Sequence, residues 1–236
     1  MVRPGTITML MTMTATAMAE PGPPPRLVIF DFDGTLSDSG GWFLSIMDHL
    51  SDRYGFRRVG KHEVEPLRRM PTRDVIRHIG IPRWRLPFIA RYVRRLFGRH
   101  THQVELFKGV PDMLAAIEAA GIRIAVVTSN SEANARAVLG AENAARISWW
   151  ACGASLFGKA PKFRKVLKAS GIPPHQVLSV GDETRDIDAA RETGVRAGAV
   201  LWGYANPDVL AHLDPDIAFA SPQAVIDYLT STEVHR

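Results

Sequence analysis

Two aspartates separated by a single residue follow an apolar stretch near the start of the chain. Residues 27–32 read Leu-Val-Ile-Phe-Asp-Phe and predict a buried strand, with Asp31 and Asp33 at its end. Two carboxylates in this position would repel each other and lose hydration unless a cation or a proton-transfer role compensates them. An Asx turn or a helix cap would account for Asp33 alone, but not readily for both residues. The pair therefore predicts metal binding or acid–base chemistry.

Further polar residues follow or precede other regular segments. A Thr-Ser-Asn run at 128–130 follows a second apolar stretch, Lys159 precedes a helical stretch, and Asp182 follows a third apolar stretch. Each has an ordinary structural explanation, because Ser, Thr and Asn cap helices and a lone lysine is usually exposed. Acidic residues in a first helical turn, such as Asp186, complement the helix dipole. Asp182 is explained least well in this way, since it lies at the strand end itself.

Short β-rich apolar stretches alternate with helical stretches, and this order predicts a parallel sheet covered by helices on both faces. The predicted strands are 27–32, 122–128, 147–152, 177–180, 197–202 and 217–220, and the predicted helices are 109–120, 131–139, 159–170, 184–193 and 222–229. We therefore expect an α/β fold with a Rossmann-like parallel sheet core, formed by residues 26–40 and 109–236.

Residues 41–108 do not follow this alternation and predict an inserted α-helical cap subdomain. The expected helices are 42–54, 61–69, 72–79 and 83–97. The insert holds 15 of the 29 basic residues and 6 of the 24 acidic ones, so the net charge of +5 arises from this segment. Because the insert follows the first strand, it should lie over the carboxyl edge of the sheet, where such folds bind ligands.

The carboxyl ends of parallel strands share one edge of a sheet, so residues distant in sequence meet there. Asp31, Asp33, Thr128, Lys159 and Asp182 should converge at this edge. Together they offer oxygen ligands for a hard divalent cation, a hydroxyl donor, a fixed ammonium group and a carboxylate nucleophile. The set predicts chemistry on a phosphoryl group.

From residue 27 to the C-terminus, the chain resembles the haloacid dehalogenase-like (HAD) hydrolase superfamily. Four motifs appear in order: Asp-Phe-Asp-Gly-Thr at 31–35, the apolar stretch ending at Thr128, a lysine near position 159, and Gly-Asp-Glu-Thr-Arg-Asp at 181–186. The first and last motifs are highly specific, and the other two count through their order and spacing. The helical insert looks like the C1 cap of the phosphoglycolate-phosphatase-like branch.

The resemblance implies a mechanism with an aspartyl-phosphate intermediate. Asp31 would attack the phosphorus, and Asp33 would protonate the leaving oxygen and later deprotonate the hydrolytic water. Thr128 would bind a phosphoryl oxygen, and Lys159 would balance the charge of nucleophile and phosphate. The remaining phosphate-binding residues that it implies, mainly through backbone N–H groups, are Gly34, Ser129 and Asn130.

The same resemblance implies a Mg²⁺ site. Its ligands would be the carboxylate of Asp31, the backbone carbonyl of Asp33 and the carboxylate of Asp182. Asp186 would support these ligands through water or hydrogen bonds. Asp33 also disfavours a 2-haloacid dehalogenase, because dehalogenases of this superfamily lack the second aspartate and a halide needs no proton to leave.

The third motif leaves two candidate lysines. Many relatives carry Lys-Pro here, whereas this chain reads Gly-Lys-Ala-Pro-Lys at 158–162, so either Lys159 or Lys162 could be the active residue. We favour Lys159, because it lies nearer the preceding strand and Lys162 would already be one turn into the helix.

The cap offers arginines for substrate recognition. The segment 68–73 reads Arg-Arg-Met-Pro-Thr-Arg and either faces the active site to hold an anionic group or forms a solvated basic surface. The aromatic residues Trp84, Phe88 and Phe97 are expected to pack inside the cap.

Composition excludes several classes of protein. No apolar run approaches the roughly 18–20 residues of a membrane span. The single cysteine, Cys152, excludes a disulfide framework and a Cys-rich zinc module and is expected to be a small buried residue. No helix-turn-helix, zinc motif or aromatic-interleaved basic stretch supports nucleic-acid binding. Monomer and homodimer both remain open.

Residues 1–25 are expected to form a disordered leader and a Pro-rich linker. An Ala-Met-Ala sequence at 17–19 has the outline of a signal-peptidase site, but the stretch before it carries one basic residue and is interrupted by threonines. An unstructured leader, or translation from an internal start such as Met18, explains the segment more simply. We therefore expect a cytoplasmic protein.

The function expected from the sequence is Mg²⁺-dependent hydrolysis of a small, anionic, phosphorylated metabolite, phosphoglycolate-like compounds being the first choice. The alternatives are a phosphosugar mutase or another HAD phosphotransferase, which share the core, and a non-catalytic basic binding protein.

Overall fold

A computed structural model describes residues 24–153 and 158–230 of the chain. The predicted leader and linker lie outside these residues, apart from their last two positions. Within the described part, no helix is long and apolar enough to cross a lipid bilayer.

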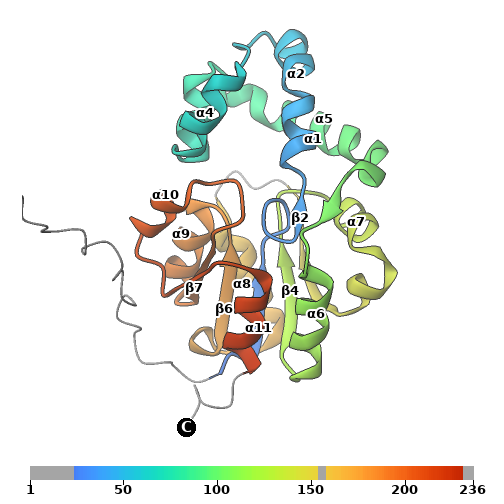
Figure 1. The fold of residues 1–236 in the computed structure, drawn as a ribbon, viewed down its shortest axis with the longest axis vertical. Helices are drawn as coiled ribbons and strands as arrows, with labels where there is room; N and C mark the ends of the chain where they lie inside the picture. The colour runs from blue at the N-terminus through green and yellow to red at the C-terminus, as the bar shows by residue number, and fades with distance from the viewer. Residues whose placement is uncertain (1–23, 154–157, 231–236) are drawn as a thin grey trace, which may run out of the picture.

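The core is a six-stranded parallel sheet with the strand order β5-β4-β1-β6-β7-β8 (Figure 1). The strands are β1 (Leu27–Phe30), β4 (Arg123–Val127), β5 (Ile147–Ala151), β6 (Val177–Gly181), β7 (Arg196–Val200) and β8 (Ile217–Phe219). Every predicted strand is present, and the prediction of a Rossmann-like α/β fold is confirmed. The strand order reverses at β1, so β1 and its two neighbours form the part of the carboxyl edge where such sheets bind ligands.

Helices cover both faces of this sheet. The core helices are α6 (Val110–Ala119), α7 (Glu132–Ala145), α8 (Ala160–Ser170), α9 (Thr184–Thr193), α10 (Pro207–Ala211) and α11 (Pro222–Thr230). Alternate residues of β1 face opposite layers: Val28 and Phe30 pack with α6, α7 and α11, whereas Leu27 and Ile29 pack with α8, α9 and α10. β1 is therefore buried on both sides, as its unbroken apolar sequence predicts.

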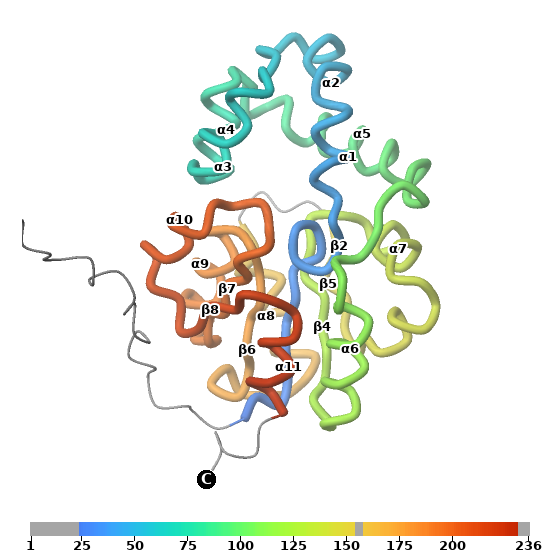
Figure 2. The backbone as a smooth tube through the Cα atoms, viewed as in Figure 1, coloured from blue at the N-terminus to red at the C-terminus, as the bar shows by residue number. Residues whose placement is uncertain are grey.

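The segment between the first strand and α6 is helical. It contains α1 (Gly40–Ser45), α2 (Met47–Tyr54), α3 (Val64–Arg68), α4 (Thr72–His78) and α5 (Leu86–Arg99), with 3₁₀ turns at Lys61–Glu63, Arg83–Arg85 and Thr101–Gln103. These helices lie beyond one end of the sheet (Figures 1 and 2). They have a small core of their own, formed by Leu50, Phe56, Ile79 and Ile89. This arrangement supports the division at 41–108, which remains our prediction.

A short antiparallel ribbon connects the helical insert to the core. β2 (Ser37–Asp38) pairs with β3 (Glu105–Leu106), so the chain enters and leaves the insert side by side. Trp42 of α1 and Phe97 of α5 pack edge to face next to this ribbon, with ring centroids 4.8 Å apart. Both side chains belong to the same apolar cluster as β1, which fixes the base of the insert on the core.

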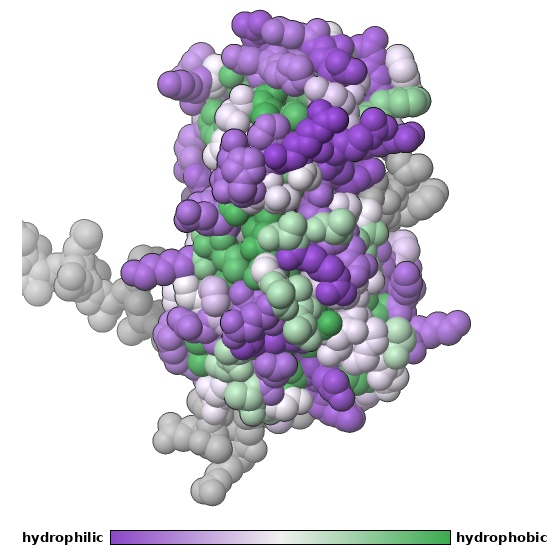
Figure 3. Space-filling model, turned by 90° about the vertical axis from the view of Figure 1, so that its right-hand side faces the viewer, coloured by the Kyte–Doolittle hydropathy of each residue, from purple (hydrophilic) through white to green (hydrophobic). Residues whose placement is uncertain are grey.

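Several local predictions need correction. The predicted helix 42–54 is interrupted at Ile46, and the helix predicted at 131–139 continues to Ala145 through a non-helical kink at Gly140. Phe97 is buried as expected, but Trp84 and Phe88 are 66% and 63% exposed, so their prediction as packed cap residues was wrong. Trp84 lies in the 3₁₀ turn before α5 and Phe88 lies in the first turn of α5, and both side chains face solvent. The face in Figure 3 shows the insert as mostly hydrophilic, with a smaller hydrophobic patch.

The helix α8 allows a direct test of core packing, because Phe163 is 1% exposed and packs under the sheet beside β1. Phe163→Ala should lower the free energy of unfolding by about 3–5 kcal/mol through lost apolar contacts and a residual cavity. Lys165→Ala, at an exposed position of the same helix, is the matched control. Urea unfolding of both variants measures the effect, and equal losses would contradict this account of the core.

Candidate active site

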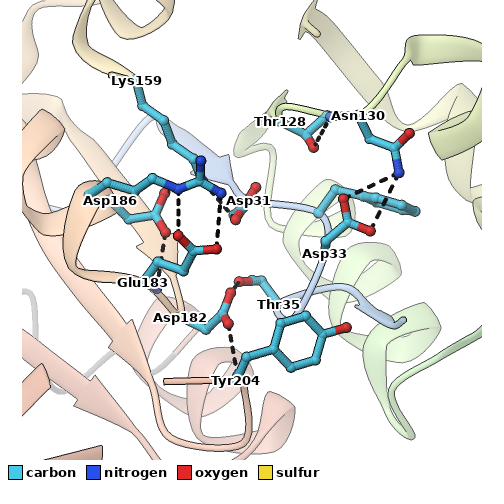
Figure 4. Close-up of polar contacts among 12 residues, drawn as sticks. Asp31, Asp33, Thr35, Thr128, Asn130, Lys159, Asp182, Glu183, Asp186 and Tyr204 are labelled. Carbon is cyan, nitrogen blue, oxygen red and sulfur yellow. Dashed lines mark hydrogen bonds and ion pairs between the residues drawn. The ribbon is translucent and has the colours of Figure 1, made fainter. Parts of the chain in front are cut away.

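The motif residues meet at the carboxyl edge of the sheet. Asp31 directly follows β1, Thr128 follows β4, and Asp182 follows β6, so the three central strands each deliver one polar residue to the same place. Figure 4 shows Thr128, Asn130 and Asp33 on one side of Asp31, and Lys159, Asp182, Glu183 and Asp186 on the other. The convergence expected from the strand pattern is therefore present in the structure.

Lys159 joins two of the carboxylates. Its Nζ lies 2.6 Å from Oδ2 of Asp31 and 2.5 Å from Oδ1 of Asp186, and all three side chains are 3% exposed. Burial lowers the pKa of Lys159, but the charges of Asp186 and Asp31 outweigh burial and hold it above its ordinary value. The site therefore favours the charged form of Lys159 next to the end of β1.

Lys162 has a different set of contacts. Its Nζ donates to the backbone carbonyl of Thr128 at 2.5 Å and to the carbonyl of Gly153. Burial and the charge of Lys159 lower its pKa to about 8. Lys162 therefore joins the loops after β4 and β5, and Lys159 is the lysine that contacts the carboxylates.

A cluster of three carboxylates could hold a cation. One oxygen from each of Asp31, Asp182 and Asp186 lies within 4.8 Å of the others, and all three residues are buried. Burial and the charges of the surrounding acids raise the pKa of Asp182 well above its ordinary value. Buried oxygen donors with an excess of negative charge fit a hard divalent cation such as Mg²⁺.

The backbone approaches Asp182 very closely from two sides. A Cβ at Gly34, which has a φ of +83°, would lie 2.2 Å from Oδ2 of Asp182, and a Cβ at Gly203 would lie 2.1 Å from its Cβ. Only glycine fits at either position. The carboxylate is held by Thr35 Oγ1, which donates to Oδ1 at 2.8 Å, and by the backbone N–H of Tyr204, which donates to Oδ2 at 2.9 Å.

Asp33 lies among hydrogen-bond donors rather than beside Lys159. Ser39 Oγ donates to its Oδ1 at 2.7 Å, and Asn130 Nδ2 donates to its Oδ2 at 3.2 Å. Burial raises the pKa of Asp33 to about 6 despite the hydrogen bond from Ser39, and the charge of Asp31 acts in the same direction. A raised pKa suits a carboxyl group that must both give and take a proton near neutral pH.

The other predicted phosphate-binding residues are present with partners of their own. Thr128 Oγ1 accepts from the N–H of Asn130 at 3.0 Å, and the carbonyl of Ser129 accepts from Arg94 of α5 at 3.4 Å. The N–H of Gly34 donates to the carbonyl of Ser37 at 2.9 Å, so it is occupied within the turn. Their roles in binding phosphate remain predictions.

Besides Arg94 of α5, the helices α3 and α4 of the insert also contact the site. Arg68 donates from Nε to the carbonyl of Tyr204 at 2.8 Å and from Nη2 to that of Gly203 at 3.2 Å. Thr72 Oγ1 donates to Oε2 of Glu183 at 3.1 Å. Of the predicted arginine segment, Arg68 therefore holds the core loop, and Arg73 is directed to solvent with its side chain 81% exposed.

The sequence analysis missed the parts played by Thr35, Ser39, Tyr204 and the Glu183–Arg185 pair. Tyr204 could have been found, because it follows the predicted strand 197–202 and so belongs to the same sheet edge. Ser39 carried no such signal. A separate cavity of about 380 Å³ between α1, α2 and α5, lined by Trp42, His49 and Tyr92 among others, contains none of the motif residues.

Known proteins resemble this chain in sequence and in fold. Residues 28–200 match the family model for the haloacid dehalogenase-like hydrolases. Phosphoglycolate phosphatase from Synechococcus elongatus is 30% identical over 206 residues, which are 87% of this chain and 97% of the relative. Tyrosine-protein kinase PtkA from Mycobacterium tuberculosis is 31% identical over 201 residues, 80% of this chain and 67% of that protein.

A solved haloacid dehalogenase-like hydrolase from Streptococcus pneumoniae has the same fold, with a TM-score of 0.71 at 20% identity over 86% of this chain and 98% of that one. The chain belongs to the haloacid dehalogenase-like hydrolase family. Within it, the protein is an enzyme of the phosphoglycolate-phosphatase-like branch, of the phosphoric monoester hydrolase type. The resemblance found in the sequence is thereby confirmed.

The acid cluster should make the metal-free protein sensitive to pH. The pKa values of Asp33 and Asp186 are raised to about 6 by burial, and burial also raises the pKa of Asp182 well above its ordinary value, so the folded state binds more protons than the unfolded chain. The stability contribution of these groups is therefore present below about pH 4 and is lost as the pH rises through about 6.

Asp182→Asn removes one of the repelling charges and should raise the melting temperature at about pH 8 by roughly 2–4 °C for each kcal/mol of relief. The gain should vanish near pH 4, and Mg²⁺ should stabilise the original protein more than the variant. Differential scanning calorimetry with EDTA or Mg²⁺ measures both effects, with exposed Asp188→Asn as the control. A lower melting temperature for Asp182→Asn at every pH would refute this view of the cluster.

Replacing Lys159 and replacing Lys162 should have different effects on stability and on turnover. Lys159→Met leaves Asp31 and Asp186 without their cation, which typically costs about 3–5 kcal/mol for a buried pair. Lys159→Met should also abolish turnover, whereas Lys162→Met removes only a link between two loops and should keep a measurable rate. Chemical unfolding and steady-state kinetics of both variants test this, and full turnover in Lys159→Met would identify the wrong lysine.

Proposed function

We propose that this protein is a Mg²⁺-dependent phosphatase that hydrolyses a small, phosphoglycolate-like phosphorylated metabolite through an aspartyl-phosphate on Asp31. The observation that carries the proposal is the position of Asp31 at the end of β1, 2.6 Å from Lys159 and within 4.8 Å of the carboxylates of Asp182 and Asp186. A carboxylate nucleophile, a fixed cation and a metal-binding cluster are the components of phosphoryl transfer.

In the first step, an oxygen of Asp31 attacks the phosphorus and the bond to the leaving oxygen breaks. Asp33 gives its proton to that oxygen, so the product leaves as an alcohol. Because the pKa of Asp33 is raised to about 6, a fraction of this carboxyl group carries the required proton at neutral pH. Lys159 stabilises the negative charge that Asp31 and the phosphoryl group bring together.

In the second step, Asp33, now a carboxylate, takes a proton from a water molecule. The water oxygen attacks the phosphorus, the bond to Asp31 breaks, and inorganic phosphate is released. Hydrogen bonds from Ser39 and Asn130 keep the Asp33 carboxylate in place between its two proton transfers. Thr128 and the backbone near Ser129 are the proposed donors to phosphoryl oxygens.

Asp31, the backbone carbonyl of Asp33 and Asp182 would hold Mg²⁺, and Asp186 would support this set through Lys159 and the Glu183 N–H, from which its Oδ2 accepts at 3.2 Å. A bound Mg²⁺ would neutralise part of the charge of the phosphoryl oxygens. The close approach of Gly34 and Gly203 to Asp182 supports this assignment, because it fixes that carboxylate in one position.

The resemblance to a phosphoglycolate phosphatase over most of both chains supports the choice of substrate. A phosphosugar mutase or another HAD phosphotransferase remains the main alternative. The similarity to a protein named as a tyrosine kinase is the observation in its favour. A non-catalytic basic binding protein is the other alternative. We propose a cytoplasmic enzyme acting on a small anionic substrate rather than on nucleic acid or a membrane, as a monomer or homodimer.

A screen of phosphorylated metabolites with Mg²⁺ should reveal release of inorganic phosphate, measured by a colorimetric assay. Excess EDTA and Asp31→Asn should both reduce the rate to background, because they remove the metal and the nucleophile. Asp33→Asn should retain binding but lose a factor of about 10²–10⁴ in turnover, the usual contribution of a general acid–base group.

The same screen separates the alternatives. An isomerised phosphate ester without free phosphate would identify a mutase, and transfer to an added acceptor would identify a phosphotransferase. Hydrolysis that survives both EDTA and Asp31→Asn would overturn the mechanism. DNA binding with a steep salt dependence, together with absent hydrolysis, would favour the binding protein.

A further inference from the structure

Arg185, in the first turn of α9, is a cation of the site that the proposed mechanism does not use. Its Nε lies 2.5 Å from Oε2 of Glu183, and its Nη2 donates to Oε1 of the same carboxylate at 2.9 Å. Only Nη2 forms a hydrogen bond, and the Nε contact is an ion pair without hydrogen-bond geometry; together the two contacts hold the guanidinium group beside Glu183. The charges of Glu183, Asp31 and Asp186 outweigh burial and hold the pKa of Arg185 above its ordinary value.

The pair with Glu183 leaves part of the guanidinium free. A guanidinium has five N–H donors, and Glu183 faces two of them. Within residues 24–153 and 158–230, no oxygen accepts a hydrogen bond from Nη1, and the side chain is 38% exposed. A rigid guanidinium with a free edge is the usual protein group for binding a carboxylate or phosphate with two hydrogen bonds.

The surroundings of Arg185 indicate which part of a substrate would meet this edge. Glu183 bonds to Arg185 on the core and accepts from Thr72 of the helical insert, so the pair lies at the boundary between them. Asp31 and Lys159 set the position of the phosphoryl group on the core side. The part of the substrate beyond the phosphoryl group must then extend towards that boundary.

We propose that Arg185 binds a carboxylate on the leaving part of the substrate and thereby selects phosphomonoesters that carry a second negative charge. Glu183 positions the guanidinium, and the contact of Glu183 with Thr72 links that position to the insert. This inference rests on the proposed function, because it assumes that the phosphoryl group lies at Asp31. It assigns the recognition of the leaving group to α9 rather than to the arginines of the insert.

Two phosphonates test this without turnover. In 3-phosphonopropionate, a methylene replaces the bridging oxygen of phosphoglycolate, and propylphosphonate has the same length without the carboxylate. Titration calorimetry of the full chain with saturating Mg²⁺ gives both dissociation constants. Arg185→Met should raise the constant for 3-phosphonopropionate by roughly ten- to hundredfold more than that for propylphosphonate.

Two further variants serve as controls. Arg185→Lys keeps the positive charge but lacks the planar guanidinium group with its paired donors. It should recover part of the difference between the two dissociation constants. Arg91→Met removes an exposed arginine of α5 and should leave both constants unchanged. Equal weakening of both phosphonates in Arg185→Met, no change in either, or no binding of either by the original protein would overturn the inference.

Hydrolysis assays separate this inference from the proposed function. If the original protein discriminates the two phosphonates through Arg185 but releases no phosphate from phosphoglycolate, the proposed function fails and the binding role stands. If it hydrolyses phosphoglycolate with Mg²⁺ and Arg185→Met lowers kcat/KM equally for phosphoglycolate and 2-hydroxyethyl phosphate, only the role of Arg185 fails.

Discussion

The rest of the site depends on the ion pairs that Lys159 forms with Asp31 and Asp186. Its ammonium group lies between Asp31 and Asp186, which are buried together with Asp182. Without this cation, three carboxylates would meet in a space from which water is largely excluded, and the cost of their desolvation would compete with folding. A single lysine at the start of α8 makes it possible for β1 and β6 to end in acids.

The positive charge of Lys159 compensates the negative charge of the carboxylates only in part. The raised pKa values of Asp33, Asp182 and Asp186 reflect the negative charge that is left over. An excess of negative charge is unfavourable for folding and favourable for binding a cation. The site therefore trades stability for affinity, as functional sites commonly do. The arginines of the insert do not neutralise this negative charge directly, because they bond mainly to backbone carbonyls near the site. Arg68, for example, donates to the carbonyls of Gly203 and Tyr204.

The sheet and the motif residues on it could be predicted because they follow from local patterns. Apolar stretches gave the strands, and parallel strands deliver Asp31, Thr128 and Asp182 to one edge whatever the side chains between them are. The choice of Lys159 over Lys162 agrees with their contacts, since position relative to the strand end decides which ammonium reaches the carboxylates. Helices of the insert were found, but their breaks were not, because Ile46 carries no sequence signal for a helix end.

Contacts that depend on tertiary structure could not be read in advance. Ser39 reaches Asp33 only because the chain turns after β2, and Glu183 pairs with an arginine two residues away while also meeting the insert. Trp84 and Phe88 show the opposite failure: their apolar character predicted burial, yet among the described residues neither side chain is covered by a neighbouring element. Hydrophobicity indicates which residues can be buried, and the arrangement of neighbours decides which of them are.

The ribbon of β2 and β3 has a consequence for how this enzyme can change. Because Ser37–Asp38 and Glu105–Leu106 are paired, the chain enters and leaves the helical insert at one short ribbon. Asp31 and Asp182 lie at the ends of β1 and β6 and Lys159 lies at the start of α8, all on the core side of that ribbon. A change within the insert therefore reaches these three residues through the ribbon or through contacts such as Thr72–Glu183 and Arg68–Tyr204.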